Sequence, residues 1–180
     1  IYDTIEAMLP HVDAVLLESV DGRPHLEQAR PVIAAGKPLF IDKPMAASLA
    51  DVIEIFRLAD EAKVPCFSSS SLRFSSVFQQ MRNNPPVGKV HGCDAYSPCS
   101  LEEHHPDLFW YGVHGVEILF TIMGTGCQSV SCTMTEGGHL VVGTWDGGRI
   151  GTFRGIRSGK SGYGATVFGA KAIESGGNYE

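Results

Sequence analysis

The chain has 180 residues, of which 43% are hydrophobic and 19% charged, so it has the composition of a globular protein that buries a substantial core. The formal net charge is −6 and no stretch concentrates lysine and arginine, which argues against nucleic acid as a partner because phosphate binding requires clustered positive charge. The longest apolar stretch, GVEILFTIMG, contains a glutamate and is too short to span a bilayer, so we expect no membrane partner either.

Three short apolar runs in the first half of the chain, at residues 13–17, 38–41 and 64–67, predict strands that are buried on both faces. Helical spacing lies between them. A first helix is expected from His25 to about residue 35, and Pro31 must lie in its first turns or bend it. Alternation of strands and helices with short links predicts parallel strands joined by right-handed crossovers.

The second expected helix begins at Ser48-Leu49-Ala50-Asp51, a capping box with aspartate as the acid. One face of this helix is predicted to carry its apolar side chains, Leu49, Val52, Ile53, Phe56, Ala59 and Ala62.

The pattern changes near residue 85, where Asn83-Asn84-Pro85-Pro86 ends a helix. A strand is expected near residues 90–96, a long helix over 107–123 with Asp107 as its N-cap and Gly124 at its end, and alternating antiparallel strands over 127–170. The predicted fold class is therefore α/β: a partial Rossmann-like parallel sheet in residues 1–84, followed by an α+β domain with a largely antiparallel open sheet in residues 85–180.

The cysteines indicate a reducing compartment. Their number is odd and no CxxC motif is present; they are Cys66, Cys93, Cys99, Cys127 and Cys132. Free thiols explain this pattern better than a disulfide framework does. We therefore expect a cytoplasmic protein.

Ligands of an open parallel sheet bind in the crevice beyond the carboxyl ends of its strands. Three loops follow the predicted strands and belong to that edge, at residues 18–24, 42–44 and 68–73. The second loop places Lys43 directly after a strand, and Pro44 restricts the backbone of Lys43 to an extended conformation. A solvated lysine at a strand end gives the same pattern, so the loop alone leaves both interpretations open.

The order of several motifs along the chain helps to decide between these two interpretations of Lys43. Residues 12–46 read VDAVLLESVDGRPHLEQARPVIAAGKPLFIDKPMA; Arg73-Phe74 follows, and then His114-Gly115-Val116-Glu117 in a helix that ends at Gly124. This ordered set resembles the Gfo/Idh/MocA family, the NAD(P)-dependent oxidoreductases that include glucose–fructose oxidoreductase and inositol dehydrogenase.

The resemblance implies an enzyme that transfers a hydride between NAD or NADP and a sugar, polyol or related cyclic alcohol. It implies Lys43 as the group that holds the reacting hydroxyl and His114 as the acid/base, and we expect both in one cleft. An imidazole takes up a proton near neutral pH, and an ammonium stabilises the alkoxide that develops. The resemblance also points to a homo-oligomer, a dimer or tetramer.

Further site residues are assigned by their place in these motifs. Those predicted to contact the cofactor are Glu18, Asp42, Lys43 and Pro44, and those predicted to contact the substrate are Arg73, Tyr111 and His105. No metal ion is expected.

The chain departs from the family at three points. Asp42 replaces a glutamate, and Trp110 replaces the aspartate that many members have four residues before the histidine, so the usual partner of the histidine is missing. No G-x-G-x-x-G sequence is present, although family members open with one to bind the pyrophosphate. We therefore expect a central piece of a longer enzyme that binds NAD(H) or NADP(H) weakly by itself.

Three alternatives remain open. The run from Gly155 to Ser161 resembles a P-loop but has one residue too few between its glycines, so a solvated hairpin turn is expected. A zinc site formed by Cys93, Cys99, His104 and His105 is conceivable, although the spacing matches no common zinc pattern. A non-catalytic sugar-binding or scaffold relative with the same fold is the third.

Overall fold

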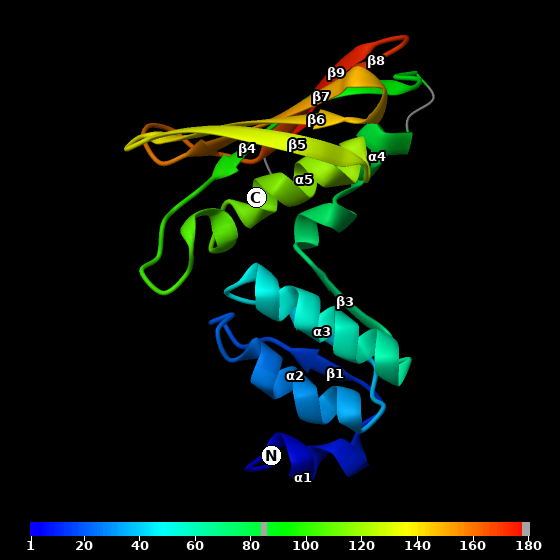
Figure 1. The fold of residues 1–180 in the computed structure, drawn as a ribbon. Coiled ribbons are helices and arrows are strands. Elements are labelled where there is room, and N and C mark those ends of the chain that lie inside the picture. Colours follow the sequence, from blue (N-terminus) through cyan, green and yellow to red (C-terminus); the bar gives the residue numbers. More distant parts are fainter. Residues whose placement is uncertain (84–85, 178–180) are drawn as a thin grey trace. The chain divides into compact units, whose positions relative to one another are not determined.

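The computed structural model describes residues 1–83 and 86–177, and the chain divides into two compact units (Figure 1). Unit 1 consists of Ile1–Ser69 and Glu102–Phe109, and unit 2 of Ser70–Leu101 and Trp110–Glu180. The predicted domain boundary between residues 84 and 85 lies outside the described residues.

Unit 1 contains a parallel sheet, as predicted. Its strands are β1 (Val15–Leu17), β2 (Leu39–Asp42) and β3 (Cys66–Ser69), in the order β1-β2-β3. The helices are α1 (Ile5–Met8), the 3₁₀ helix η1 (Leu9–His11), α2 (His25–Ala34) and α3 (Leu49–Ala62).

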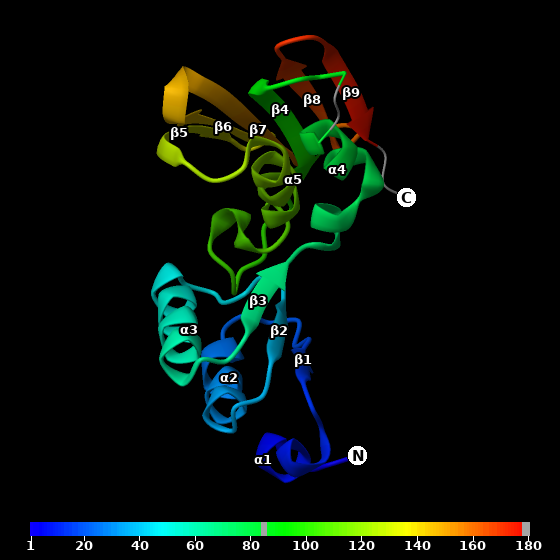
Figure 2. The same cartoon turned by 90° about the vertical axis from the view of Figure 1, so that its right-hand side faces the viewer.

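The strands of this sheet are buried on one face, whereas both faces were expected to be buried. Val15, Leu39 and Ile41 are buried in the core that α2 and α3 complete. On the other face Leu16 is 65% exposed, and Phe67 is 54% exposed with its ring 5.0 Å from that of Phe40. The reason is that α2 and α3 both lie on the same side of β1–β3 (Figure 2).

Local signals set the ends of both helices. Gly36 follows α2 with a φ of 69°, a left-handed conformation that suits glycine. Pro31 lies inside α2 and not in its first turn, contrary to one of the two expected placements. Ser48 caps α3 by accepting a hydrogen bond from the Asp51 N–H at 3.1 Å, as predicted.

The buried face of α3 differs from the predicted one. Ile55 and Ala59 are buried, with Val52 and Leu58 partly buried beside them, while Leu49, Ile53 and Phe56 are exposed. The predicted apolar face was therefore displaced by about one residue around the helix, because the apolar residues between 52 and 56 fit two adjacent helical faces.

Unit 2 is built on a six-stranded, largely antiparallel sheet, as predicted. The strand order is β5-β6-β7-β4-β8-β9, and only β4 and β7 are parallel among its described pairs. The strands are β4 (Val90–Pro98), β5 (Cys127–Thr135), β6 (Gly138–Trp145), β7 (Arg149–Ile156), β8 (Gly164–Gly169) and β9 (Ile173–Gly177). The loop between β7 and β8 holds the sequence that resembles a P-loop; it leads into a strand rather than a helix and passes β4, so it is not a hairpin turn.

The helices α4 (Ser76–Asn83) and α5 (Val113–Met123) cover one face of this sheet (Figure 1). Unit 2 also contains the 3₁₀ helices η2 (Ser71–Phe74) and η4 (Asp146–Gly148), whereas η3 (Asp107–Phe109) belongs to unit 1. Ile118, Leu119 and Ile122 of α5 are buried, as are Phe153 and Trp145 of the sheet. Gly115 allows this packing, because a Cβ at that position would collide with the ring of Phe153.

The long helix starts six residues later than predicted, at Val113 and not at residue 107. Asp107 does not cap it; that residue has a φ of 42° and opens the separate helix η3. Gly124 does end the helix, as predicted, with a φ of 75°.

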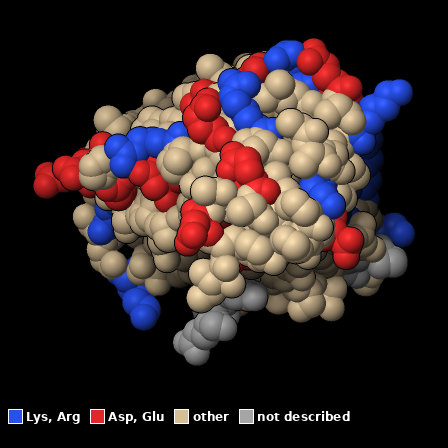
Figure 3. Space-filling model, turned by 90° about the horizontal axis from the view of Figure 1, so that it is seen from below, with Lys and Arg blue, Asp and Glu red and all other residues tan. Residues whose placement is uncertain are grey.

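On the face seen in Figure 3, basic side chains stand among acidic and uncharged ones. Among the residues that the structure describes, no helix has both the length and the apolar character needed to cross a membrane. All five cysteines are free thiols.

Candidate functional site

The carboxyl edge of the parallel sheet in unit 1 brings together the residues predicted to contact the cofactor. Leu17 lies opposite Ile41 at the end of β1, so Glu18 follows at the same level as Asp42, and Asp42 in turn lies opposite Ser69 of β3. Glu18 is exposed, and Asp42 is half-buried.

The loop after β2 continues from this edge. Lys43 is half-buried, Pro44 is buried, and the peptide bond between them is cis. Position 43 thus offers an ammonium group directly beyond the end of a buried strand.

A buried histidine fastens the loops after β1 and β2 to each other. The His25 ring is fully buried at the start of α2, with Nε2 2.8 Å from the Ser19 carbonyl and Nδ1 3.2 Å from the Met45 carbonyl. Because Ser19 and Met45 belong to the two loops, this ring fixes their backbones and has a structural role.

His105 fastens the segment Glu102–Phe109 to the loop after β1. Its Nε2 accepts a hydrogen bond from the Gly22 N–H at 3.1 Å, and its Nδ1 lies 2.8 Å from a Glu102 carboxylate oxygen. The acceptor role of Nε2 places the proton of the neutral ring on Nδ1. With both nitrogens engaged and the side chain 2% exposed, His105 positions this segment, and its predicted contact with the substrate remains untested.

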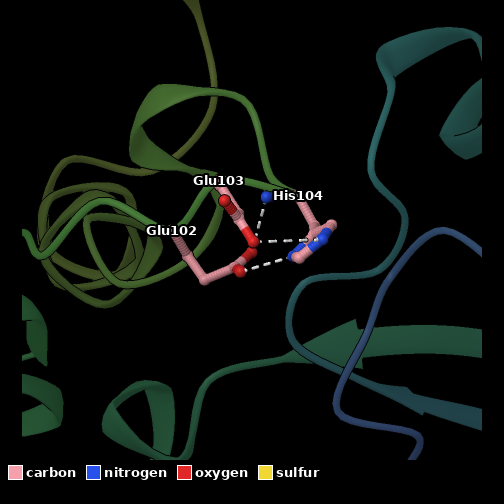
Figure 4. A group of neighbouring side chains, drawn as sticks. All are labelled: Glu102, Glu103 and His104. Atoms are coloured by element: carbon pink, nitrogen blue, oxygen red, sulfur yellow. Dashed lines mark hydrogen bonds and ion pairs between the residues drawn. The ribbon is translucent and has the colours of Figure 1, made fainter.

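Carboxylates surround His105 and its neighbour. Hydrogen bonds from His105 and His104 lower the pKa of Glu102 to about 2, and the Arg23 guanidinium, which binds Asp21, holds the pKa of Asp21 well below its usual range. Glu102, Glu103 and His104 form the one group of three potential metal ligands found in the described part of the chain (Figure 4). They are hydrogen-bonded and ion-paired to one another, and no cysteine belongs to the group.

The centre of unit 2 is the contact of His114 with Ser70. His114 lies in the first turn of α5, and its Nδ1 is 2.7 Å from Ser70 Oγ. Ser70 is 1% exposed, and its hydroxyl also accepts a hydrogen bond from the Leu72 N–H at the start of η2. The Ser70 oxygen therefore has one further lone pair, which can accept a hydrogen bond from His114.

Glu117, one turn along α5, secures Ser70. Its carboxylate accepts a hydrogen bond from the Ser70 N–H at 3.3 Å and forms an ion pair with Arg73. The Glu117 side chain is 11% exposed and that of Arg73 is 49% exposed. The H-x-x-E spacing thus places one residue against the hydroxyl of Ser70 and the other against its backbone.

Two tyrosines line the His114 ring. The ring of Tyr111 lies 5.1 Å from it and that of Tyr163 lies 6.0 Å from it, both edge to face. Burial, followed by a hydrogen bond with Tyr111, raises the pKa of Tyr163 to about 12, so this phenol is neutral at physiological pH.

This arrangement suits proton transfer at His114 Nε2. When Nδ1 carries the proton and donates a hydrogen bond to Ser70 Oγ, Nε2 carries no proton and can act as a base. The same hydrogen bond persists after Nε2 takes up a proton, so no rearrangement is needed.

The structure brings three of the predicted residues together in unit 2, namely His114, Tyr111 and Arg73, and aligns Glu18, Asp42, Lys43 and Pro44 in unit 1. Sequence reasoning missed Ser70, Glu117 and Tyr163 as parts of the His114 environment. The run Ser68–Ser71 after a predicted strand was the available signal for Ser70. No sequence signal identified Tyr163, which follows the loop after β7.

Residues 1–70 match the sequence model of an oxidoreductase family described as having an NAD-binding Rossmann fold. An uncharacterized oxidoreductase of Synechocystis sp. is 32% identical over 80 residues, which are 43% of this chain and 21% of that protein.

Solved structures of several dehydrogenases are similar over nearly the whole chain. GenD2 from gentamicin A biosynthesis, in complex with NAD, has a TM-score of 0.79 and 18% identity, with 98% of this chain and 58% of GenD2 covered. Myo-inositol 2-dehydrogenase from Lactobacillus plantarum has a TM-score of 0.78 and 13% identity (97% and 60% covered). Scyllo-inositol dehydrogenase from Lactobacillus casei has a TM-score of 0.77 and 16% identity (96% and 59% covered).

The chain thus spans only about 58% to 60% of the length of these structures. At such low identity they establish a shared fold, with the parallel sheet followed by the larger, mostly antiparallel one. Residues 1–70 thus match the Gfo/Idh/MocA oxidoreductase family, in agreement with the resemblance found in the sequence.

Proposed function

We propose that the protein is an oxidoreductase that transfers a hydride between a nicotinamide cofactor, NAD or NADP, and a hydroxyl group of a sugar, polyol or related cyclic alcohol. The match of residues 1–70 to an NAD-binding oxidoreductase family is the observation that supports this most directly. The structural similarity to GenD2 in complex with NAD and to two inositol dehydrogenases favours the same cofactor and substrate class.

The carboxyl edge of β1–β3 has groups that fit a dinucleotide. Glu18 and Asp42 offer acceptors for hydroxyl groups, and Lys43 offers donors beside them. When bound, the nicotinamide supplies the site that accepts or returns the hydride. The 180-residue sequence contains no G-x-G-x-x-G turn for the pyrophosphate, so we propose that this chain alone binds the cofactor weakly and is inactive.

His114 and Lys43 divide the remaining chemistry. Oxidation of an alcohol releases a proton from its hydroxyl, and His114 Nε2 takes up this proton while Nδ1 stays bound to Ser70 Oγ. The Lys43 ammonium stabilises the negative charge that develops on the substrate oxygen. In the reverse direction His114 returns the proton.

Arg73 and Tyr111 are proposed to contact the substrate. Tyr111 lies against the His114 ring, and Arg73 retains donors beyond those used by Glu117 because half of its side chain is exposed. Ser70 takes the place of the acid that Trp110 replaces, since its hydroxyl oxygen lies 2.7 Å from His114 Nδ1.

Two lysine–proline pairs at opposite ends of β2 provide a matched test. In the full-length protein, Lys43→Ala is expected to lower kcat by about 100-fold or more in an assay that follows NADH or NADPH with myo-inositol and glucose as substrates. Lys37→Ala, which removes the lysine before Pro38 at the other end of the strand, is the control and leaves kcat unchanged. Equal effects of the two changes contradict the role of Lys43.

A non-catalytic sugar-binding or scaffold relative is the alternative, and Trp110 in place of an acid favours it. Such a protein shows no turnover as the wild type, and Lys43→Ala and His114→Asn show none either. Titration of the full-length protein with NADH, followed by the fluorescence of the nicotinamide, separates the two: an oxidoreductase binds it at micromolar concentration.

The full-length protein is proposed to be a homo-oligomer, as the family resemblance implies. The face of the large sheet opposite α5 exposes Ile150 (53%), Phe168 (36%) and Ile173 (66%), and such faces commonly pair. Sedimentation equilibrium is expected to give a dimer or tetramer, and Ile150→Asp is expected to shift it toward the monomer.

A further inference from the structure

A cavity of about 380 Å³ lies within unit 2, bordered by η2, α4 and α5. This volume is in the range of sites for small molecules. Its lining combines the guanidinium groups of Arg73 and Arg82 with Gln79, Thr121 and the rings of Phe74 and Phe120.

Positive charge predominates in this cavity, although the chain as a whole carries −6. Arg82 has no ion pair or hydrogen bond with another residue in the described part of the chain. Arg73 is paired with Glu117, the only acid of the lining, but half of its side chain is exposed and it has further N–H donors. The lining therefore has a net charge of +1.

We infer that this cavity binds a small molecule through a single carboxylate group. The planar guanidinium of arginine matches a carboxylate with two parallel hydrogen bonds. A dianion such as phosphate is disfavoured, because Glu117 is part of the lining and α5 directs its C-terminal, negative end toward Gly124 and Thr125. Phe74 and Phe120 offer apolar contacts to the remainder of the ligand.

Carbonyls at the end of α5 do not compete with the ligand. The Met123 carbonyl accepts from Arg149 Nη1 at 2.9 Å, and the Gly124 carbonyl accepts from Trp145 Nε1 at 3.0 Å. Trp145 also offers a probe. The ring of Phe120, a residue of the lining, lies 5.3 Å from that of Trp145, so a ligand in the cavity is expected to alter the fluorescence of Trp145.

The test is direct binding without cofactor or turnover, so its failure leaves the proposed oxidoreductase activity untouched. D-glucuronate is titrated into the protein and followed by calorimetry and by tryptophan fluorescence, in parallel with D-glucose, which lacks the carboxylate, and with inorganic phosphate. We expect binding of glucuronate in the millimolar range or tighter and weaker binding of phosphate. Glucose is a candidate substrate of the proposed active site, so any binding of glucose is expected to be unaffected by Arg82→Gln. No heat or fluorescence change with glucuronate up to about 10 mM, or tighter binding of phosphate, overturns the inference.

Variants locate the site. Arg82→Gln removes an exposed guanidinium. It is expected to weaken the binding of glucuronate about 10-fold, because a charge-assisted hydrogen bond is lost. Lys89→Gln makes the same change of charge on an exposed residue of unit 2 outside the cavity and is expected to leave affinity unchanged. Unaltered affinity in Arg82→Gln, with folding verified by circular dichroism, contradicts the assignment.

Discussion

Ser70 Oγ lies 2.7 Å from His114 Nδ1, although the two residues are 44 positions apart in the chain. The contact fixes the orientation of the imidazole, as a carboxylate does in many acid/base pairs, and in the proposed mechanism Nε2 exchanges the proton. The serine is held in turn by the Glu117 carboxylate at its backbone N–H.

Ser70→Ala is expected to lower kcat of the full-length enzyme about 10-fold with little change in KM, because the ring loses its orientation while the base itself remains. Ser70→Thr keeps a hydroxyl and is expected to restore most of the activity. The measurement is kcat as a function of pH, since a base with altered hydrogen bonding titrates differently. Ser71→Ala, the exposed neighbour, is the control. A pH profile unchanged in Ser70→Ala contradicts the positioning role.

Arg157 joins several backbone and side-chain groups of the large sheet. It donates to the Glu136 carbonyl at 3.0 Å, to the Thr135 carbonyl and to His139 Nδ1 at 2.7 Å. Arg157→Ala removes these hydrogen bonds and is expected to lower the free energy of unfolding by about 2 kcal/mol. Urea denaturation measures this, and Arg154→Ala, an exposed arginine of β7, is expected to have a much smaller effect.

Glu102 makes stability depend on acidity. Its pKa falls from the ordinary 4.5 to about 2 in the folded chain because His105 and His104 bind the carboxylate. A depressed pKa contributes stability that is complete above pH 4.5 and is lost as pH falls toward 2. The wild type is therefore expected to exceed Glu102→Gln in stability at pH 6, and the difference is expected to vanish near pH 2. Thermal unfolding across this range measures it; Glu103→Gln, with 81% of the side chain exposed, is the control.

The thiols are expected to react at different rates with an aromatic disulfide reagent at pH 8. Cys132 is exposed and is expected to react first. Cys93 is buried, and burial raises its pKa to about 12; Cys99 is fully buried. Both are expected to react only after unfolding. Cys132→Ser is expected to remove the fast phase, and a fast phase that persists in this variant contradicts the assignment.

Those parts of the fold that depend on neighbours in sequence were predictable. The capping serine at position 48 and the glycine at position 36 determine their helix ends through contacts within a few residues. The start of α5 was not, because residues 102–109 pack into unit 1 through His105, and this tertiary contact prevents Asp107 from starting the helix.

The site was predictable only in part. Lys43 and His114 were identified by family resemblance, and their roles remain proposals. Ser70 and Glu117 were given no role because their contacts join residues 44 and 47 positions apart, and neither the serine run nor the spacing from His114 to Glu117 reveals such a contact. The prediction of the buried face of α3 was wrong for a different reason. Val52, Ile53, Ile55 and Phe56 are all apolar, so packing rather than periodicity decides which of them are buried.

The assignment of residues 102–109 to unit 1 means that the polypeptide changes units three times, at 69/70, 101/102 and 109/110. A single cut therefore cannot release either unit intact: truncation after Ser69 would leave Gly22 without the imidazole that accepts its N–H. Anyone who excises one unit for separate study needs to retain or replace this returning segment.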